Sequence, residues 1–231
     1  MALSDISSDK LRALADEVDA AASLLRHGQN VLKAYRFAAH DADTVFVCLA
    51  GGVEKLLKLS AGMRSLHDTG RWPSREVMKD EWGHNIVELD RYVRALVGQH
   101  RCDSTVPGLI AELLATVDAD PHIKKILSTL GAYAQGGRFY NLDHLASAPQ
   151  PHTSPRELWE ELHRGLVNDH PELLNKLASP GTSKEARAAL NDYIINSFAG
   201  WQELITRAWR TGVLGQEAKR WAPQLMPPRR C

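Results

Sequence analysis

The chain has 231 residues, 44% of them hydrophobic and 24% charged, which is ordinary globular usage and enough to bury a sizeable core. Lysine and arginine total 28, as do aspartate and glutamate, so no net charge draws the protein to nucleic acid or acidic membranes, and any RNA contact must be local. Three scattered cysteines indicate neither a disulfide framework nor a zinc site. Without a signal-peptide core or an apolar run of about 20 residues, we expect a cytoplasmic protein.

Apolar residues recur at three- and four-residue steps from the N-terminal region onward, which predicts helices. A first helix is expected over about Ser8–His27, ended by Gly28, and a long central helix over Asn30–Leu66. Gly51 and Gly52 lie inside the second helix, where each glycine lowers helix stability by about 1 kcal/mol relative to alanine. Gly52 falls on the apolar stripe, however, where a missing side chain lets another helix approach closely. We therefore favour a continuous or slightly bent helix, with a break as the alternative.

A loop over Asp68–Pro73 leads to a second long central helix, expected over Ser74–Val97. Its polar side, opposite the apolar face, carries His84. Proline just inside a helix start is favourable, which predicts shorter helices beginning near Pro107 and Pro121.

The C-terminal third is expected to hold further helices after a break. Residues 146–155 contain three prolines and form the best linker candidate. A capping box of Thr182 and Glu185 begins the last long helix, which runs to Thr211. This helix has more apolar residues than a narrow contact with one neighbouring helix requires. We therefore expect it either to pack on the bundle or to form a dimerisation surface. These residues are Tyr193, Phe198, Trp201, Leu204 and Trp209.

We predict an all-α fold, a bundle of about seven helices with the two long helices at its centre. The expected organisation is a helical bundle at residues 1–145, a linker at 146–155, C-terminal helices at 156–222 and a flexible tail at 223–231.

Two Glu-x-x-His pairs have the spacing of a carboxylate-bridged di-iron site in a bundle. They are Glu81 with His84 and Glu160 with His163. Each pair needs a carboxylate from another helix; Glu54 is available for the first, and none stands out for the second. Solvated surface explains both pairs more simply, so we expect no metal and no cofactor and keep the di-iron site as a distant alternative.

The stretch Gly51-Gly52-Val53-Glu54-Lys55-Leu56-Leu57-Lys58-Leu59, followed after a loop by Gly83-His84-Asn85, resembles the helical HEPN-type proteins. In those proteins a long helix with a G-x-E-K-L-x-K pattern leads to a Gly-His-Asp helix. The resemblance covers about Val45–Leu96, and Asn85 stands where aspartate is expected. A simpler interpretation is that Glu54 and Lys58 form an i,i+4 ion pair worth a few tenths of a kcal/mol and that His84 lies at a helix end.

The resemblance implies metal-independent RNA cleavage by an arginine and a histidine four to six residues later. Here these would be Arg138 and His144, with five residues between them, and His84 joins them as a candidate site residue. An imidazole can move the ribose 2′-OH proton while a guanidinium stabilises the pentacoordinate phosphate. Phe139 departs from the family, which usually has a polar residue after the arginine. The alternative is that Phe139, Tyr140 and Leu142 fill the core while Arg138 is a surface residue.

Three functions follow as hypotheses. The first is a HEPN-like endoribonuclease or RNA-binding component of a toxin or phage-defence system. Its implied partners are RNA, an antitoxin-like protein and a second copy of the chain. The second is a non-catalytic helical binding or regulatory module. The third is the distant di-iron carboxylate bundle.

Overall fold

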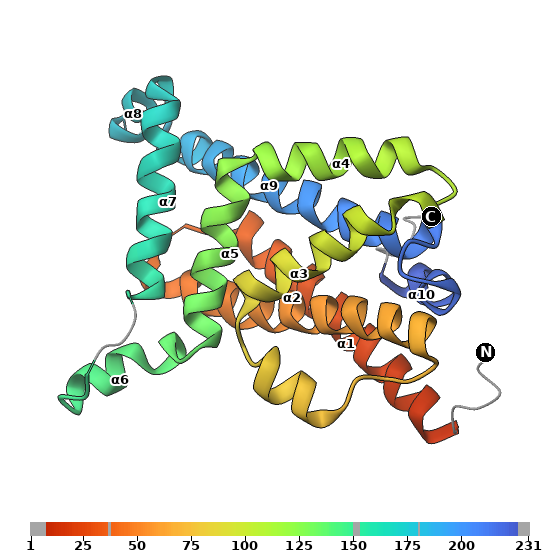
Figure 1. The fold of residues 1–231 in the computed structure, drawn as a ribbon. Helices are drawn as coiled ribbons and strands as arrows, with labels where there is room; N and C mark the ends of the chain where they lie inside the picture. The colour runs from red at the N-terminus through yellow and green to blue at the C-terminus, as the bar shows by residue number, and fades with distance from the viewer. Residues whose placement is uncertain (1–7, 37, 150–152, 180, 226–231) are drawn as a thin grey trace.

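The computed structural model describes residues 8–36, 38–149, 153–179 and 181–225 (Figure 1). Across these ranges the regular structure is helical and contains no strand, which confirms the predicted all-α class. It is divided into more helices than the seven or so expected. They are α1 (Ser8–Lys33), α2 (Ala38–Thr69), α3 (Ile86–Gln99), α4 (Pro107–Ala119), α5 (Pro121–Ala134), α6 (Tyr140–Leu145), α7 (Pro155–Asp169), α8 (Pro171–Ala178), α9 (Ser183–Thr211) and α10 (Gln216–Trp221). Short π or 3-10 turns are η2 (Val77–Glu81), η3 (Arg101–Asp103), η4 (Gly137–Phe139) and η5 (Ala222–Leu225).

The first chain reversal lies later than predicted. Helix α1 continues through Gly28 to Lys33, and α2 begins only at Ala38, so the expected ends at Gly28 and Asn30 are wrong. Gly28 is buried where α1 meets α2, and a Cβ there would lie 2.4 Å from Leu49 Cδ2. Its role is close packing between the helices, because a larger side chain would collide with α2.

Helix α2 is continuous through Gly51 and Gly52, as favoured from the sequence. A Cβ at Gly52 would lie 2.9 Å from Leu25 Cγ and 3.0 Å from the Leu25 backbone nitrogen. The absence of a side chain therefore lets α1 cross α2 closely, which confirms the predicted reason for a glycine on this stripe.

The second long central helix is interrupted. The π turn η2 is followed by Gly83, whose φ of +48° is a left-handed conformation that glycine adopts readily. Asn85 then caps α3, its side-chain oxygen accepting a hydrogen bond from the Glu88 backbone nitrogen at 3.2 Å. The predicted helix over Ser74–Val97 is thus wrong, because a left-handed residue and a new cap separate η2 from α3.

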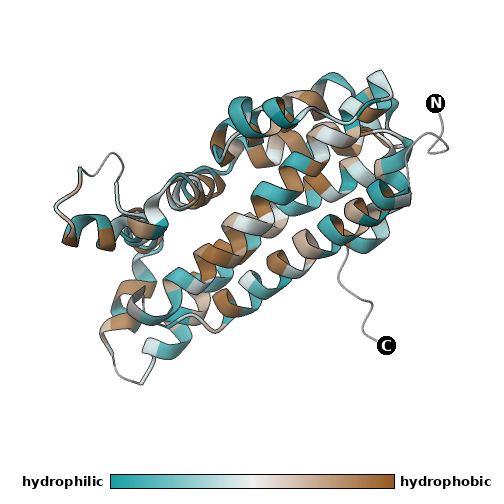
Figure 2. Cartoon of the chain, turned by 90° about the horizontal axis from the view of Figure 1, so that it is seen from below, coloured by the Kyte–Doolittle hydropathy of each residue, from teal (hydrophilic) through white to brown (hydrophobic). Residues whose placement is uncertain are grey.

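One apolar cluster unites most of the helices. Helix α2 packs against α1, α3 and α5, while α9 packs against α4, α5 and α1 (Figure 1). Figure 2 shows hydrophobic and hydrophilic residues on different sides of the helices, as expected where one face of each is buried. The largest fully buried side chains are Trp159, Trp201, Trp209, Phe46 and Phe198.

The apolar surplus predicted for α9 is used inside the chain. Phe198, Trp201, Leu204 and Trp209 are all fully buried in the common core. Of the two alternatives, these four residues pack on the bundle, and a dimerisation surface made from them is wrong. The indole Nε1 of Trp209 donates a hydrogen bond to Ser60 Oγ at 2.8 Å and so joins α9 to α2. These residues anchor α9 to the bundle.

The division into a bundle, a linker and C-terminal helices stays a prediction. Core residues come from both sides of the expected linker at 146–155, of which 150–152 lie outside the described residues. The expected tail at 223–231 begins inside η5, where Leu225 is buried, and residues 226–231 are not described. Among the described residues, no helix combines the length and apolar character needed to cross a membrane.

Candidate functional site

Three residues of the HEPN-like pattern meet at one place. Glu54 and Lys58 lie one turn apart on α2, and His84 comes from the turn before α3. The His84 Nδ1 atom lies 3.0 and 3.1 Å from the two carboxylate oxygens of Glu54, and Lys58 Nζ lies 2.9 Å from Glu54 Oε1. Glu54 is therefore shared by one imidazole and one ammonium group.

The turn that carries His84 is fixed by its neighbours. Gly83 supplies the left-handed conformation, and the Asn85 backbone nitrogen donates to the Trp82 carbonyl at 3.3 Å. Since asparagine caps helices as well as aspartate does, Asn85 at the position where the resemblance expects aspartate keeps the same local geometry.

The arrangement gives His84 a defined hydrogen-bonding role. A carboxylate only accepts hydrogen bonds, so the Nδ1 atom facing Glu54 carries the proton in the neutral imidazole, as assigned from this network. Nε2 is then the proton-accepting atom, on a side chain that is 61% exposed. A histidine oriented by a carboxylate in this way can serve as a general base or bind a ligand donor.

A second ion pair and a pocket adjoin this cluster. Lys55 pairs with Glu17 of α1, and both side chains line a pocket of about 350 Å³ together with Glu54 and Lys58. Trp72, from the loop after α2, also lines the pocket. Sequence reasoning missed Glu17 and Trp72 because only the packing of α1 and of the loop brings them to the middle of α2.

The structure places Arg138 and His144 on a different segment. Arg138 belongs to η4 and His144 to α6, and both are exposed. The guanidinium carbon of Arg138 lies 5.0 Å from the centre of the Phe139 ring, a cation–π contact. His84 is bonded to Glu54 instead of joining this pair.

The alternative in which this segment fills the core is wrong for two of its residues. Phe139 is 49% exposed and Leu142 is 63% exposed, although Arg138 is a surface residue as that alternative held. Helix α6 contacts mainly η4, and in Figure 1 it stands away from the main body of the bundle. Because so few elements surround α6, its apolar side chains stay open to solvent.

The two Glu-x-x-His pairs do not form a metal site. His163 is enclosed by aromatic rings, stacked on Tyr35 at 5.5 Å between ring centres, and its Nδ1 donates to the Trp159 carbonyl at 2.9 Å. Burial lowers the pKa of His163 and raises the pKa of Tyr35 to about 12. Across the described residues no three His, Cys, Asp or Glu side chains are grouped to hold a metal ion. His163 is a half-buried histidine packed against aromatic residues, so the expected solvated surface is wrong for it.

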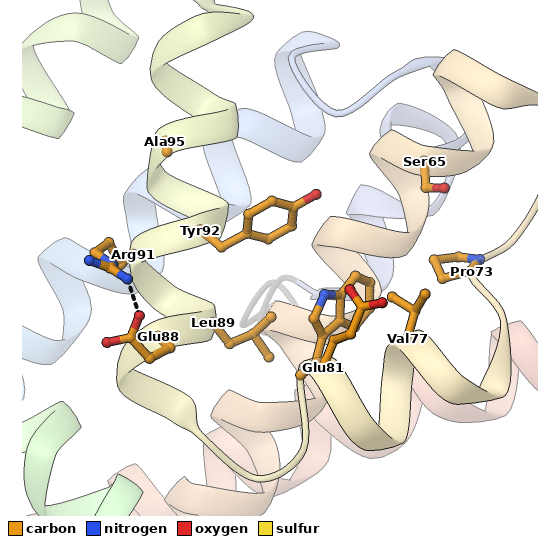
Figure 3. Close-up of a pocket in the computed structure, with 10 residues that line it drawn as sticks. Ser65, Pro73, Val77, Glu81, Glu88, Leu89, Arg91, Tyr92 and Ala95 are labelled. Atoms are coloured by element: carbon orange, nitrogen blue, oxygen red, sulfur yellow. Dashed lines mark hydrogen bonds and ion pairs between the residues drawn. The ribbon is translucent and has the colours of Figure 1, made fainter.

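The largest pocket described here, of about 730 Å³, lies between the end of α2, the turn η2 and α3. Figure 3 shows Leu89 and Tyr92 on the α3 side, facing Pro73, Val77 and Glu81. The rings of Tyr92 and Trp82 lie 6.2 Å apart, and an ion pair between Glu88 and Arg91 lies at the rim. Its chemistry is that of an apolar and aromatic cleft with a charged edge.

Comparison with protein-family models, with curated protein sequences and with solved structures gives no significant match.

Proposed function

We propose that this chain is a HEPN-like, RNA-directed protein that acts as a metal-independent endoribonuclease. The observation that carries the proposal is the exposure of both Arg138 and His144 on one short segment, uncovered by the apolar residues between them. The contacts that join Glu54, Lys58 and His84 add support, because residues of the HEPN-like pattern that are about 30 positions apart act as one packed unit.

The chemistry requires only side chains of this kind. The imidazole of His144 accepts the proton of a ribose 2′-OH, and the oxygen attacks the adjacent phosphorus as the bond to the 5′ oxygen breaks. Arg138 stabilises the charge on the pentacoordinate phosphate, and its contact with Phe139 orients the guanidinium. The leaving 5′ oxygen takes a proton from water or a second imidazole. The products are a 2′,3′-cyclic phosphate and a 5′-hydroxyl.

A second copy of the chain completes the site in this proposal. Phe139, Leu142 and Leu145 follow one another at three-residue steps beside the pair and are 49%, 63% and 81% exposed. Such a row is typical of a contact surface, and in HEPN-type proteins the arginine and histidine commonly act in a cleft between protomers. We infer a homodimer through η4 and α6, instead of through α9.

The test is cleavage of a labelled single-stranded RNA in the presence of chelator. Wild type should cut and leave cyclic phosphate ends, whereas Arg138→Ala and His144→Ala should fail. Arg75→Ala and His27→Ala remove exposed residues of the same types elsewhere and should cut normally. An RNA that stays intact with folded wild type would rule out the enzymatic proposal.

A non-catalytic binding or regulatory module is the second candidate. The pocket of about 730 Å³ with Tyr92 and Trp82 favours it, because apolar clefts of this size hold small ligands or side chains of a partner. An intact RNA together with retained binding of RNA or an antitoxin-like protein would support this candidate.

The biological setting is part of the proposal. We propose a cytoplasmic component of a toxin or phage-defence system. A nucleotidyltransferase or nuclease gene beside this one would support that setting. If the neighbouring genes regularly encoded proteins of other kinds, that would oppose it.

A further inference from the structure

A strongly basic pocket of about 390 Å³ lies between the end of α1 and the first turns of α9. Lys33 and Arg36 line it from the α1 side, and Lys184 and Arg187 line it from α9. No carboxylate is among the described residues that line it. Since the whole chain has a formal charge of zero, four cations around one pocket are a marked local excess.

The floor of this pocket is held rigidly. Asn191 of α9 is 4% exposed, and its Nδ2 donates to the Tyr35 carbonyl at 2.9 Å. The Tyr35 side chain is itself buried against Trp159, with ring centres 6.1 Å apart. The backbone that carries Lys33 and Arg36 is thereby fixed against α9.

The positions of the α9 cations are not explained by helix stability. Lys184 is the second residue of α9, and the N-terminal turn of a helix favours negative charge, so an ammonium group there is unfavourable. Arg187 follows one turn later on the same side of the helix. Lys33, by contrast, suits the C-terminal end of α1.

Three of the four cations have no carboxylate partner among the described residues. Across the described ranges, the side chains of Lys33, Arg36 and Lys184 form no ion pair with a carboxylate. The Arg187 guanidinium lies 3.4 Å from Ser183 Oγ, and Asp41 accepts a hydrogen bond from the Arg36 backbone nitrogen at 2.8 Å. The like charges repel one another, and a bound anion would relieve that repulsion.

We propose that this pocket binds phosphate groups. The Arg36 guanidinium can make paired hydrogen bonds to phosphate oxygens, while the two ammonium groups and the charge of Arg187 add attraction for an anion. The volume is sufficient for a diphosphate or for the phosphates of a nucleotide. The phosphates can belong to a free small molecule or to an RNA chain. The pocket shares no residue with Arg138 and His144, so this inference does not depend on the proposed cleavage.

The experiment measures two probes on the full chain at fixed ionic strength. Inorganic pyrophosphate is titrated by calorimetry, and a labelled single-stranded RNA is followed by fluorescence anisotropy. The test variant is Arg36→Glu with Lys184→Glu. The matched control is Lys124→Glu with Lys219→Glu, two exposed lysines outside the pocket that give the same change in charge. Unchanged thermal melting checks that both variants are folded.

We expect the test variant to bind at least about 100-fold more weakly than wild type and the control to bind nearly as wild type does, because each charged contact is worth about tenfold. Loss of pyrophosphate binding identifies a small phosphate ligand, whereas loss of RNA binding alone identifies the phosphates of an RNA chain. Failure of folded wild type to bind either probe at millimolar concentration, or equal weakening in the control, would overturn the inference. If the test variant binds phosphate weakly but still cleaves RNA, the binding pocket and the proposed cleavage site are separate, and each proposal can fail without the other.

Discussion

Replacing Asp90 with alanine should destabilise the protein strongly, because this carboxylate joins α3 to α9 in the core. Asp90 is 2% exposed; the Trp201 Nε1 donates to its Oδ1 at 2.7 Å, and the Arg94 Nε donates to its Oδ2 at 2.8 Å. Removal leaves a buried indole N–H unpaired, which costs about 1–3 kcal/mol, and breaks a largely buried ion pair, for which losses of about 3–5 kcal/mol are typical.

For Asp90→Ala we expect a loss at the lower end of the range for a buried ion pair, about 3 kcal/mol. The Arg94 side chain is 21% exposed and keeps a second carboxylate, Asp118, so its charge is not left isolated. We therefore expect a loss of about 3 kcal/mol in the free energy of unfolding, equivalent to about 6–12 °C in melting temperature for a chain of this size. Asp90→Asn keeps an acceptor for Trp201 and should lose less.

Urea unfolding followed by tryptophan fluorescence and circular dichroism measures these losses. Asp118→Ala is the matched control: its side chain is 59% exposed and pairs with the same Arg94, so the expected loss is below about 1 kcal/mol. If Asp90→Ala lost no more stability than Asp118→Ala, Asp90 would not join α3 to α9 as its contacts indicate.

Three other changes test the packing and the site. Gly52→Ala should lower the free energy of unfolding by about 1–3 kcal/mol in chemical unfolding, because its Cβ would meet Leu25. Gly200→Ala, with open space around it, should instead raise the free energy of unfolding by up to about 1 kcal/mol. Equal effects of the two changes would contradict the close approach of α1. Burial lowers the pKa of His163 from its ordinary 6.5, so just below pH 6.5 the unfolded state binds more protons than the folded state and the free energy of unfolding decreases as the pH is lowered. The expected slope is at most about 1.4 kcal/mol per pH unit. A difference in stability between wild type and His163→Gln that stays constant from pH 7 to 5 would contradict this. Leu142→Glu with Leu145→Glu should leave the helical spectrum unchanged and give a monomer in light scattering where wild type is a dimer, and a wild-type monomer would contradict that interface.

The sequence was sufficient to predict that the chain is helical, but not to predict where the helices end. Three- and four-residue spacing predicts the all-α class, and the position of Gly52 on the apolar stripe predicts its contact with Leu25. The same spacing runs on through Gly28 and past Gly83, so periodicity alone could not show that one glycine lies within a helix and the other adopts a left-handed turn.

The candidate sites depend on contacts between distant segments. Glu54 and Lys58 are one turn apart and their pairing could be predicted, but the approach of His84 depends on the turn η2 and the cap of α3. Lys33 and Lys184 carry no signal in the sequence that relates them, since about 150 residues separate them. Only the packing of α9 against the end of α1 places them around one pocket.

The most direct test of the proposed function is the single-turnover rate of RNA cleavage in chelator by wild type and His144→Ala. We expect the variant to cut about 10²- to 10⁴-fold more slowly, with unchanged helical content and melting temperature, because a positioned general base is lost. A variant that cuts as fast as wild type would contradict the role of His144 as the general base.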